Sequence, residues 1–277
     1  MAKKSISYKK QFDLSGRTAV VTGATGILGK LFCAGLAEFG AKIAVVDLDE
    51  TVAVNYAKEL QERYDTECMG IACDVSKPKE IKIMAETVEE SLGAIGILHN
   101  NAATKGDDLE KFFAPFEEYT LETWREIMSV NLDGLFFVAQ EIGTRMANRG
   151  KGSIIQTASI YGATMGPDQR IYEGSEYMGM PINTPPPYSA SKGGVVGLTN
   201  YLATYWAKRG VRVNTLTPGG VESGQNDIFS KKYSERVPME RMADGNEMVG
   251  TLVFLASDAS SYITGQNIFI DGGLSVW

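Results

Sequence analysis

Apolar runs of strand length alternate with amphipathic stretches of helix length along the chain. The apolar runs predict strands at 17–23, 41–47, 67–74, 95–100, 152–159, 211–218 and 267–273. The stretches between them predict helices at 29–40, 49–64, 77–92, 120–148, from 188 onward and near 246–256. Continuously apolar strands separated by helices are typical of a parallel sheet covered on both faces. Right-handed crossovers then favour an α/β fold with one doubly wound sheet of about seven strands.

The same pattern indicates one domain with a short tail. Residues 1–12 carry four lysines and are expected to form a flexible basic tail, whereas residues 13–277 contain no linker or internal repeat. Two segments, 160–187 and 219–245, have no clear period. Both follow the presumed carboxyl ends of strands, where open α/β sheets bind ligands. Because loops of this length in a compact domain are usually functional, both are candidate parts of the site.

Composition restricts the possible partners. The net charge of −7 over 277 residues argues against nucleic-acid binding. No apolar run reaches the length of a membrane span and the first residues lack the apolar core of a signal peptide, so we expect a cytoplasmic protein. Three cysteines without metal-ligand spacing and one histidine, His99, argue against a metal site. We expect His99 to be a packed residue, and the partner to be a small molecule.

A glycine turn follows the first predicted strand. The sequence TGATGILG places Gly23, Gly26 and Gly29 between a strand and a helix, where backbone amides can approach a pyrophosphate closely. Asp47 ends the second strand, where a carboxylate can accept hydrogen bonds from adenosine ribose hydroxyls and repel a 2′-phosphate. NAD is therefore favoured over NADP. The alternatives are a plain tight turn for the glycines and a helix N-terminal acid for Asp47.

Further motifs follow the glycine turn in a specific order. They are Asp74-Val75, the NNAA run from Asn100 to Ala103, Asn131 in SVNLDG, Ser159 in IIQTASIYG, Tyr188 and Lys192 in YSASK, and Thr217-Pro218-Gly219-Gly220. With these motifs the chain resembles the short-chain dehydrogenase/reductase family over nearly its whole length. The family usually spaces its glycines TGxxxGxG, whereas here Ile27 stands at the middle glycine position, so we expect a small change in turn geometry.

The resemblance implies a single Rossmann-like domain, a homotetramer or homodimer, and roles for named residues. The implied catalytic residues are Ser159, Tyr188, Lys192 and Asn131. The expected cofactor contacts, which combine the resemblance with the glycine turn and Asp47, are Gly23, Thr25, Gly26, Ile27, Leu28, Asp47, Asp74, Val75, Asn100, Asn101, Ala102, Tyr188, Lys192, Thr217, Gly219 and Val221. By the same resemblance, Ser159 would hydrogen-bond the substrate oxygen and Asn131 would complete a water-linked proton relay.

Tyr188 and Lys192 have a spacing that suits proton transfer. Three prolines precede Tyr188, which predicts a helix start there, and the i, i+4 spacing then places both side chains on one face. Moving a proton to or from an alcohol oxygen calls for a group with a pKa near the working pH. The reference pKa of tyrosine is about 10, and a nearby ammonium is expected to lower it. An accidental surface pair is the alternative.

The segment between Ser159 and Tyr188 is longer than is usual in the family and rich in hydrogen-bonding groups. We expect residues 165–187 to fold over the site as a lid, with Ser159, Tyr161, Arg170 and Glu173 as substrate contacts. Such a lining suits a sugar, a polyol or a sugar derivative. IYEG and FLASDASSYITGQN also resemble bacterial surface-sugar and flagellin-glycan oxidoreductases. The alternatives are an acyl or xenobiotic carbonyl reductase, a non-catalytic NAD-binding protein, and a subunit-contact role for the segment.

Overall fold

A computed structural model describes residues 7–277, and seven of its strands form one parallel sheet. In chain order they are β1 (Thr18–Thr22), β2 (Lys42–Asp47), β3 (Cys68–Ala72), β4 (Ile95–Asn100), β5 (Gly152–Thr157), β8 (Val211–Pro218) and β9 (Asn267–Ile270). Their order in the sheet is β3-β2-β1-β4-β5-β8-β9, with every neighbouring pair parallel. The predicted doubly wound sheet is therefore confirmed, and the strand order reverses between β1 and β4.

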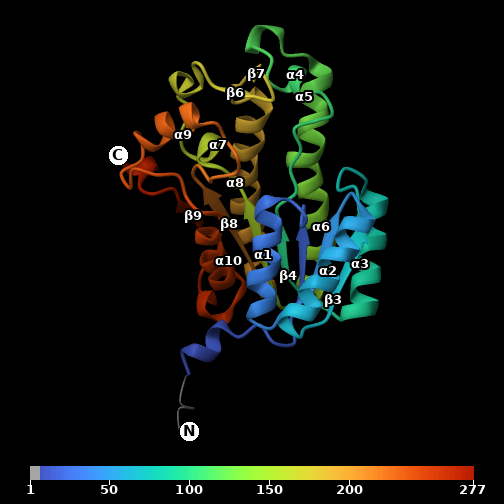
Figure 1. The fold of residues 1–277 in the computed structure, drawn as a ribbon. Helices are drawn as coiled ribbons and strands as arrows, with labels where there is room; N and C mark the ends of the chain where they lie inside the picture. Colours follow the sequence, from blue (N-terminus) through green and yellow to red (C-terminus); the bar gives the residue numbers. More distant parts are fainter. Residues whose placement is uncertain (1–6) are drawn as a thin grey trace.

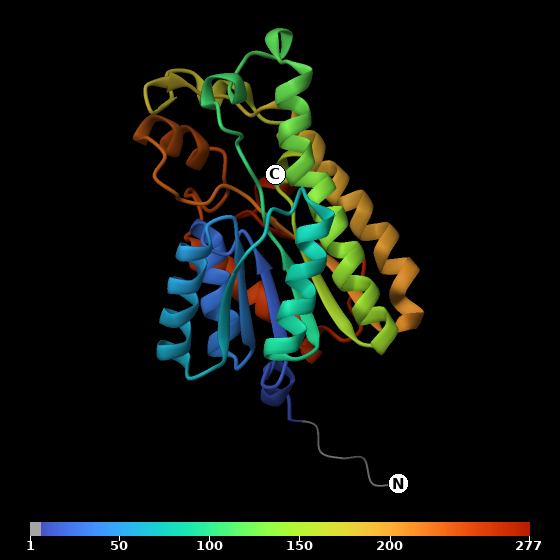
Figure 2. The same cartoon turned by 90° about the vertical axis from the view of Figure 1, so that its right-hand side faces the viewer.

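Helices cover both faces of this sheet (Figures 1 and 2). One face packs against α1 (Ile27–Glu38), α2 (Glu50–Tyr64) and α10 (Val249–Ala256), and the other against α3 (Pro78–Leu92), α6 (Leu135–Arg149) and α8 (Pro186–Trp206). Because the inner strands β1, β2, β4, β5 and β8 have a helix layer on either side, most of their side chains are buried, whereas those of the edge strands β3 and β9 are only partly buried. This explains why the strands are continuously apolar instead of alternating.

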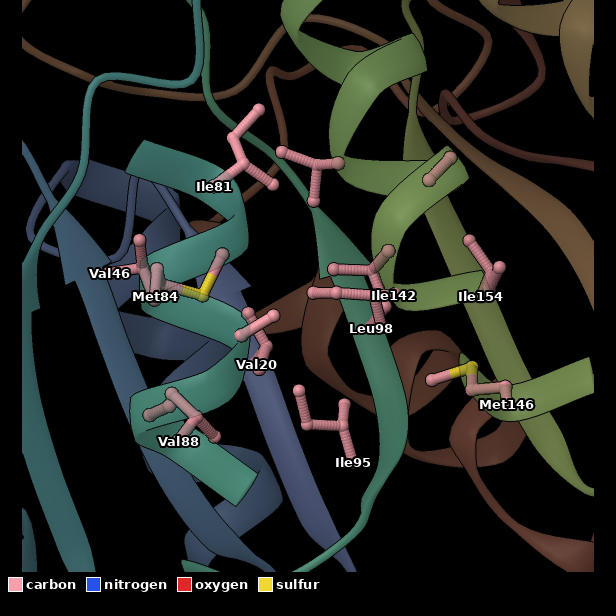
Figure 3. Packing of buried hydrophobic residues seen from close by; sticks show 14 of the residues in the cluster. Val20, Val46, Ile81, Met84, Val88, Ile95, Leu98, Ile142, Met146 and Ile154 are labelled. Atoms are coloured by element: carbon pink, nitrogen blue, oxygen red, sulfur yellow. The ribbon is translucent and has the colours of Figure 1, made fainter. Parts of the chain in front are cut away.

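Figure 3 shows the core on the α3 and α6 face. The cluster joins side chains from both helices to side chains of β1, β2, β4 and β5: Val20, Val46, Ile81, Met84, Val88, Ile95, Leu98, Ile142, Met146 and Ile154. All of these side chains are buried, and removing their apolar surface from water favours the packed arrangement. This packing holds the sheet rigidly beneath the site at its carboxyl edge.

The helix predicted at 120–148 is not a single α-helix. It consists of α5 (Leu121–Met128), a π-helical turn at Ser129–Gly134, and α6. Thr120 begins α5 as its cap, because its hydroxyl accepts a hydrogen bond from the amide of Thr123 at 3.2 Å. π turns are rare and often occur at functional sites. Here the turn contains Asn131.

The two segments without a period lie together at the carboxyl end of the sheet (Figures 1 and 2). They contain short elements: α7 (Ile160–Ala163), an antiparallel hairpin of β6 (Glu176–Tyr177) and β7 (Met180–Pro181), and α9 (Asp227–Ser234). The small helix α4 (Leu109–Phe112) lies at the same end. The insertion is thus an ordered structure above the strand ends.

The start of the described chain differs from the sequence expectation. Lys9–Phe12 form a 3-10 helix where the sequence predicts an irregular tail, and the ring of Phe12 lies 6.4 Å from that of Phe254. Lys3 and Lys4 fall outside the described residues. Between residues 7 and 277, no helix is long and apolar enough to cross a membrane, and no three His, Cys, Asp or Glu side chains are grouped to hold a metal ion. The cytoplasmic location stays a prediction.

Candidate active site

A groove of about 290 Å³ runs along the amino end of α1. Its lining consists of Gly23, Thr25, Gly26, Ile27, Leu28, Gly29, Asp47, Asn101 and Ala103. Gly23 has a φ of +62°, and a Cβ on Gly29 would lie 2.1 Å from the Gly23 carbonyl oxygen, so the turn requires glycine at both positions. The first turn of α1 contains no acidic residue, which leaves its amide ends suited to a phosphate. These features fit a dinucleotide.

Asp47 lies in this groove at the end of β2, as predicted. Its carboxylate accepts hydrogen bonds from the amide and the hydroxyl of Thr25, at 2.8 and 2.7 Å, and from the amide of Leu48 at 2.8 Å. These bonds hold the carboxylate against the glycine turn. Oδ2 already accepts both bonds from Thr25, but Oδ1 can accept a further hydrogen bond, so the position suits a ribose hydroxyl.

Asp74 and Val75 lie beside the groove without lining it. The Asp74 carboxylate accepts hydrogen bonds from the amide and hydroxyl of Ser76 and pairs with Lys77 at 3.1 Å. Partial burial acts to raise the pKa of Asp74, but the Ser76 hydrogen bonds and the Lys77 ammonium outweigh it and hold the pKa below its usual value. Contact of Asp74 and Val75 with an adenine stays a prediction.

The side chain of Asn100 has a structural role and does not line the groove, and contact of this residue with a cofactor stays a prediction. It is 1% exposed, and its amide group donates to the carbonyl of Leu135 at 2.8 Å and to Gln156 at 3.3 Å. Side chains alternate between the two faces of a strand. Asn100 therefore points into the protein, whereas the next residue, Asn101, points the other way. Asn101 does line the groove.

Thr22 has a role that the sequence analysis missed. Its hydroxyl accepts hydrogen bonds from the amides of Asn101 and Ala102, at 3.0 and 3.1 Å, and donates to Asn100 at 3.3 Å. It therefore ties the end of β1 to the loop that follows β4, across the point where the strand order reverses. The only sequence signal was a polar residue at the end of an apolar strand.

The Lys192 side chain is buried on α8 and joins this helix to the end of β5. It is 4% exposed, and its ammonium donates to the carbonyl oxygen of Thr157 at 2.9 Å. Burial lowers the pKa of Lys192 to about 8. The Thr157 hydroxyl in turn donates to Asn101 at 3.2 Å and lies 3.3 Å from Nε2 of His99. Lys192 is thus anchored to a polar cluster formed by Thr157, Asn101 and His99.

Tyr188 lies one turn before Lys192 on α8, as predicted, with Ser159 beside it. The ammonium of Lys192 is 5.9 Å from the centre of the Tyr188 ring. The expected lowering of the tyrosine pKa is not found, because burial raises the pKa of Tyr188 and only a hydrogen bond with Ser159 offsets part of that rise. The Lys192 ammonium is directed at Thr157 instead. The phenol is therefore protonated at neutral pH.

Asn131 is held in the π turn with one side of its amide unpaired. Its oxygen accepts a hydrogen bond from the amide of Thr104 at 2.8 Å, while its buried Nδ2 finds no acceptor among the described residues. A buried donor without a partner is costly, so it marks a position where a water or ligand atom fits. Its predicted place in a proton relay stays a prediction.

Gly162 lets the Ser159 loop contact α8 directly. Its φ is +94°, and a Cβ there would lie 2.0 Å from the carbonyl oxygen of Ser189. On the facing helix, a Cβ at Gly193 would lie 3.0 Å from the Gly162 carbonyl oxygen. This backbone-to-backbone contact, which only glycine permits, brings Ser159 beside Tyr188. Sequence reasoning did not identify it.

A cavity of about 490 Å³ contains Ser159, Tyr188 and Lys192. The insertion closes one side of it with Tyr161, Tyr172, Ile182, Asn183, Thr184 and Pro185. Gly219 and Val221 form another wall, as predicted, but Thr217 is fully buried in β8 with its hydroxyl donating to Asn267. Contact of Thr217 with a nicotinamide stays a prediction, and the predicted covering of the cavity by the insertion agrees with its lining.

Arg170 and Glu173 do not reach this cavity, which corrects their predicted role as substrate contacts. Their side chains are 82% and 74% exposed. The Arg170 guanidinium donates from Nε and Nη2 to the two oxygens of Asp168, at 2.9 and 2.7 Å, which directs it at Asp168. The backbone carbonyls of Arg170 and Glu173 accept hydrogen bonds from Lys232 of α9, at 3.0 and 2.7 Å. This contact turns both side chains outward.

Comparison with known proteins gives a consistent group of relatives. The sequence model of a family described as enoyl-(acyl carrier protein) reductase matches residues 23–275. D-threitol dehydrogenase of Mycolicibacterium smegmatis is 34% identical, over 99% of this chain and 98% of that protein.

Solved structures agree with this relationship. A gluconate 5-dehydrogenase from Burkholderia cenocepacia, in complex with NADP and tartrate, is 32% identical with a TM-score of 0.85, covering 97% of this chain and 98% of that one. An NAD⁺-bound xylitol dehydrogenase is 27% identical with a TM-score of 0.82, covering 94% of this chain and 99% of that one. Both dinucleotides thus occur among similar structures.

His99 generates a prediction about pH. Burial, with a smaller contribution from the Lys192 ammonium, lowers the pKa of His99 to about 3. An unfolded histidine has a pKa near 6.5, so between roughly pH 6.5 and pH 3 the unfolded chain binds a proton that the folded chain does not. Stability is therefore expected to fall as the pH falls through this range, by up to about 1.4 kcal/mol per pH unit.

Urea unfolding at pH 7, 6 and 5 measures this slope, and His99→Leu is the comparison: whatever its stability at pH 7, the change of its stability with pH should lack the imidazole contribution. Since the chain has a single histidine, its imidazole NMR signal needs no assignment. A folded protein whose imidazole titrates with a midpoint near 6.5 would contradict the prediction.

Proposed function

The chain belongs to the short-chain dehydrogenase/reductase family and is an NAD(P)-dependent oxidoreductase that acts on CH–OH groups, and from this premise we propose that it interconverts a secondary alcohol and ketone of a sugar, polyol or sugar derivative. The observation that carries this proposal is the meeting of Ser159, Tyr188 and Lys192 in one cavity. Hydroxyl and amide groups of Thr104, Asn183 and Gln225 line the same cavity. These groups suit a substrate with several hydroxyls. Similar proteins named as threitol, gluconate and xylitol dehydrogenases support the same substrate class.

Each side chain has a distinct task in the proposed reaction. Tyr188 gives its phenolic proton to the substrate oxygen during reduction and takes it back during oxidation. Ser159, which lines the same cavity as the phenol, holds the substrate oxygen in place. Lys192 lies one helical turn from the phenol with its ammonium on the Thr157 carbonyl, and we assign to it, with Asn131, the path of the proton to solvent. When bound, the nicotinamide supplies or accepts the hydride.

The high pKa of Tyr188 fits the reducing direction at neutral pH, because the phenol is then protonated and ready to donate. Oxidation requires the phenolate, and its rate should rise towards alkaline pH.

We propose NAD as the preferred cofactor. Among residues 7–277, Asp47 is the one charged side chain in the lining of the dinucleotide groove, and no Lys or Arg lines it. A carboxylate there accepts from ribose hydroxyls and repels a 2′-phosphate.

We also propose a homotetramer or homodimer. Tyr201 and Tyr205 are 61% and 59% exposed on α8 and stack with their ring centres 5.6 Å apart, and Phe136 of the neighbouring α6 is 40% exposed. Figure 2 shows α6 and α8 side by side along one flank. Exposed apolar groups gathered on one flank often mark an interface, and closed symmetry is usual for identical chains.

Removing the phenol tests the proposed acid. Tyr188→Phe keeps the ring and deletes the hydroxyl, so turnover of threitol, galactitol or gluconate should fall by about 10²–10⁴-fold while NAD affinity stays close to wild type. Tyr205→Phe is the matched control, since it makes the same change on the same helix outside the cavity. If Tyr188→Phe kept more than about a tenth of wild-type turnover, another group would have to move the proton.

Cofactor choice tests the role of Asp47. Wild-type protein should bind NAD at least about tenfold more tightly than NADP, and Asp47→Asn should narrow that ratio, because the amide keeps an acceptor for Thr25 but no longer repels a phosphate. Calorimetric titration of both dinucleotides measures the ratio. Asp49→Asn, which keeps the α2 cap, controls for a general loss of charge. Equal affinity of the wild type for both dinucleotides would refute the assignment.

Light scattering tests the assembly. A mass of two or four chains is expected at micromolar concentration, and Tyr201→Glu should shift it towards smaller species because a charge would be buried at the contact. A wild-type monomer would overturn the proposal.

A further inference from the structure

The cavity that contains Tyr188 has a one-sided charge. Its lining includes two lysines, Lys105 and Lys192, and among the described residues no Asp or Glu. This is unusual in a chain whose net charge is −7. Uncompensated positive charge in a concave site attracts an anion, because the low-dielectric walls focus its field.

The two lysines differ in what they can contact. Lys192 is buried and committed to the carbonyl of Thr157 at the reacting end of the cavity. Lys105 is exposed on the loop between β4 and α4, and within residues 7–277 it forms no ion pair. Its ammonium lies 4.6 Å from the centre of the Tyr177 ring, which belongs to β6 of the insertion. Lys105 is therefore free to bind an anion.

The backbone around Lys105 is anchored, so its position is built into the fold. The amide of Thr104 donates to Asn131 at 2.8 Å, and the amide of Gly106 donates to the Thr104 hydroxyl at 2.9 Å. The amide of Asp107 donates to Glu126 at 3.0 Å. These three bonds hold the loop on both sides of Lys105, and its ammonium reaches the Tyr177 ring of the insertion.

The insertion contributes a hydrogen-bonding side chain, Asn183, to the cavity that Lys105 also lines. The Asn183 amide nitrogen donates to the carbonyl of Phe113 at 2.8 Å, and the Phe113 ring lies 6.4 Å from that of Tyr177. The buried Asn183 oxygen has no donor partner among the described residues. A hydroxyl of a bound molecule would satisfy that acceptor.

Lys105 does not belong to the dinucleotide groove. The groove along α1 is lined by the glycine turn, Asp47, Asn101 and Ala103, and Lys105 is absent from it. An anion held by Lys105 would thus lie in the substrate cavity, separate from the phosphates of a dinucleotide at the amino end of α1.

We propose that Lys105 binds an anionic end group, a carboxylate or a phosphate, of a polyhydroxy substrate whose reacting carbon lies at Tyr188. This inference rests on the proposed function and narrows its substrate class to sugar acids or sugar phosphates in preference to neutral polyols. Arg170, which the sequence predicts as a substrate contact, has its guanidinium paired with Asp168. Lys105 takes that place.

Three probes that share a carbon chain test the proposal: D-glucitol, D-gluconate and D-glucitol 6-phosphate. With saturating NAD, wild-type kcat/KM should be at least about tenfold higher for one of the anionic probes than for glucitol. Comparing gluconate with glucitol 6-phosphate distinguishes carboxylate from phosphate. Lys105→Met should lower kcat/KM for the preferred anion by about 10–100-fold, mainly through KM, and leave glucitol turnover within about twofold.

Lys105→Arg should restore most of the anion preference because it keeps the charge. Lys111→Met is the control, since Lys111 pairs with Asp108 and lies outside the cavity. The inference is overturned if wild-type protein prefers glucitol, if Lys105→Met affects all three probes equally, or if it weakens NAD binding.

Failure of the proposed function would be separately visible. If no probe is turned over, calorimetry of gluconate and glucitol 6-phosphate binding to the NAD-loaded protein decides the inference alone. Anion binding by the wild type that is lost in Lys105→Met supports it, and an absence of anion binding by the wild type overturns it.

Discussion

The hydrogen bond from the buried Lys192 ammonium to the carbonyl of Thr157 ties α8 to the end of β5. A buried ammonium without a partner would be costly, so the helix and the strand must stay within bonding distance. Ser159 follows Thr157 by two residues and Tyr188 precedes Lys192 by one helical turn. Their meeting in one cavity depends on this bond, and the Thr157 hydroxyl extends it to Asn101 of the dinucleotide groove.

A backbone contact also holds the loop after β5 against α8. Gly162 approaches Ser189 so closely that no side chain fits between them. The insertion is then held on two sides, by Lys232 of α9 on its carbonyls and by Asn183 on the carbonyl of Phe113. The insertion therefore forms a fixed wall of the cavity, and its outer side chains face solvent.

The charges of the two cavities have opposite sign, and each suits a different ligand. Asp47 gives the dinucleotide groove a carboxylate where ribose hydroxyls would bind, and the amide ends of α1 suit phosphates. The substrate cavity has Lys105 and Lys192 without an acidic residue. An acidic protein can thus bind an anionic substrate, because local charge in a concave site matters more than net charge.

The sequence by itself determined the doubly wound sheet, the glycine turn, Asp47 at the end of β2 and the Tyr188–Lys192 pair, because periodicity and i, i+4 spacing are local properties. It did not reveal the π turn, since the apolar pattern of 120–148 is independent of backbone hydrogen-bond register. Only the tertiary structure decided which polar side chains reach the substrate cavity. Arg170 is turned away by Asp168 and Lys232, whereas Lys105 is brought to the wall by Asn131 and Glu126. Such choices depend on contacts between segments far apart in the chain, which no local pattern encodes.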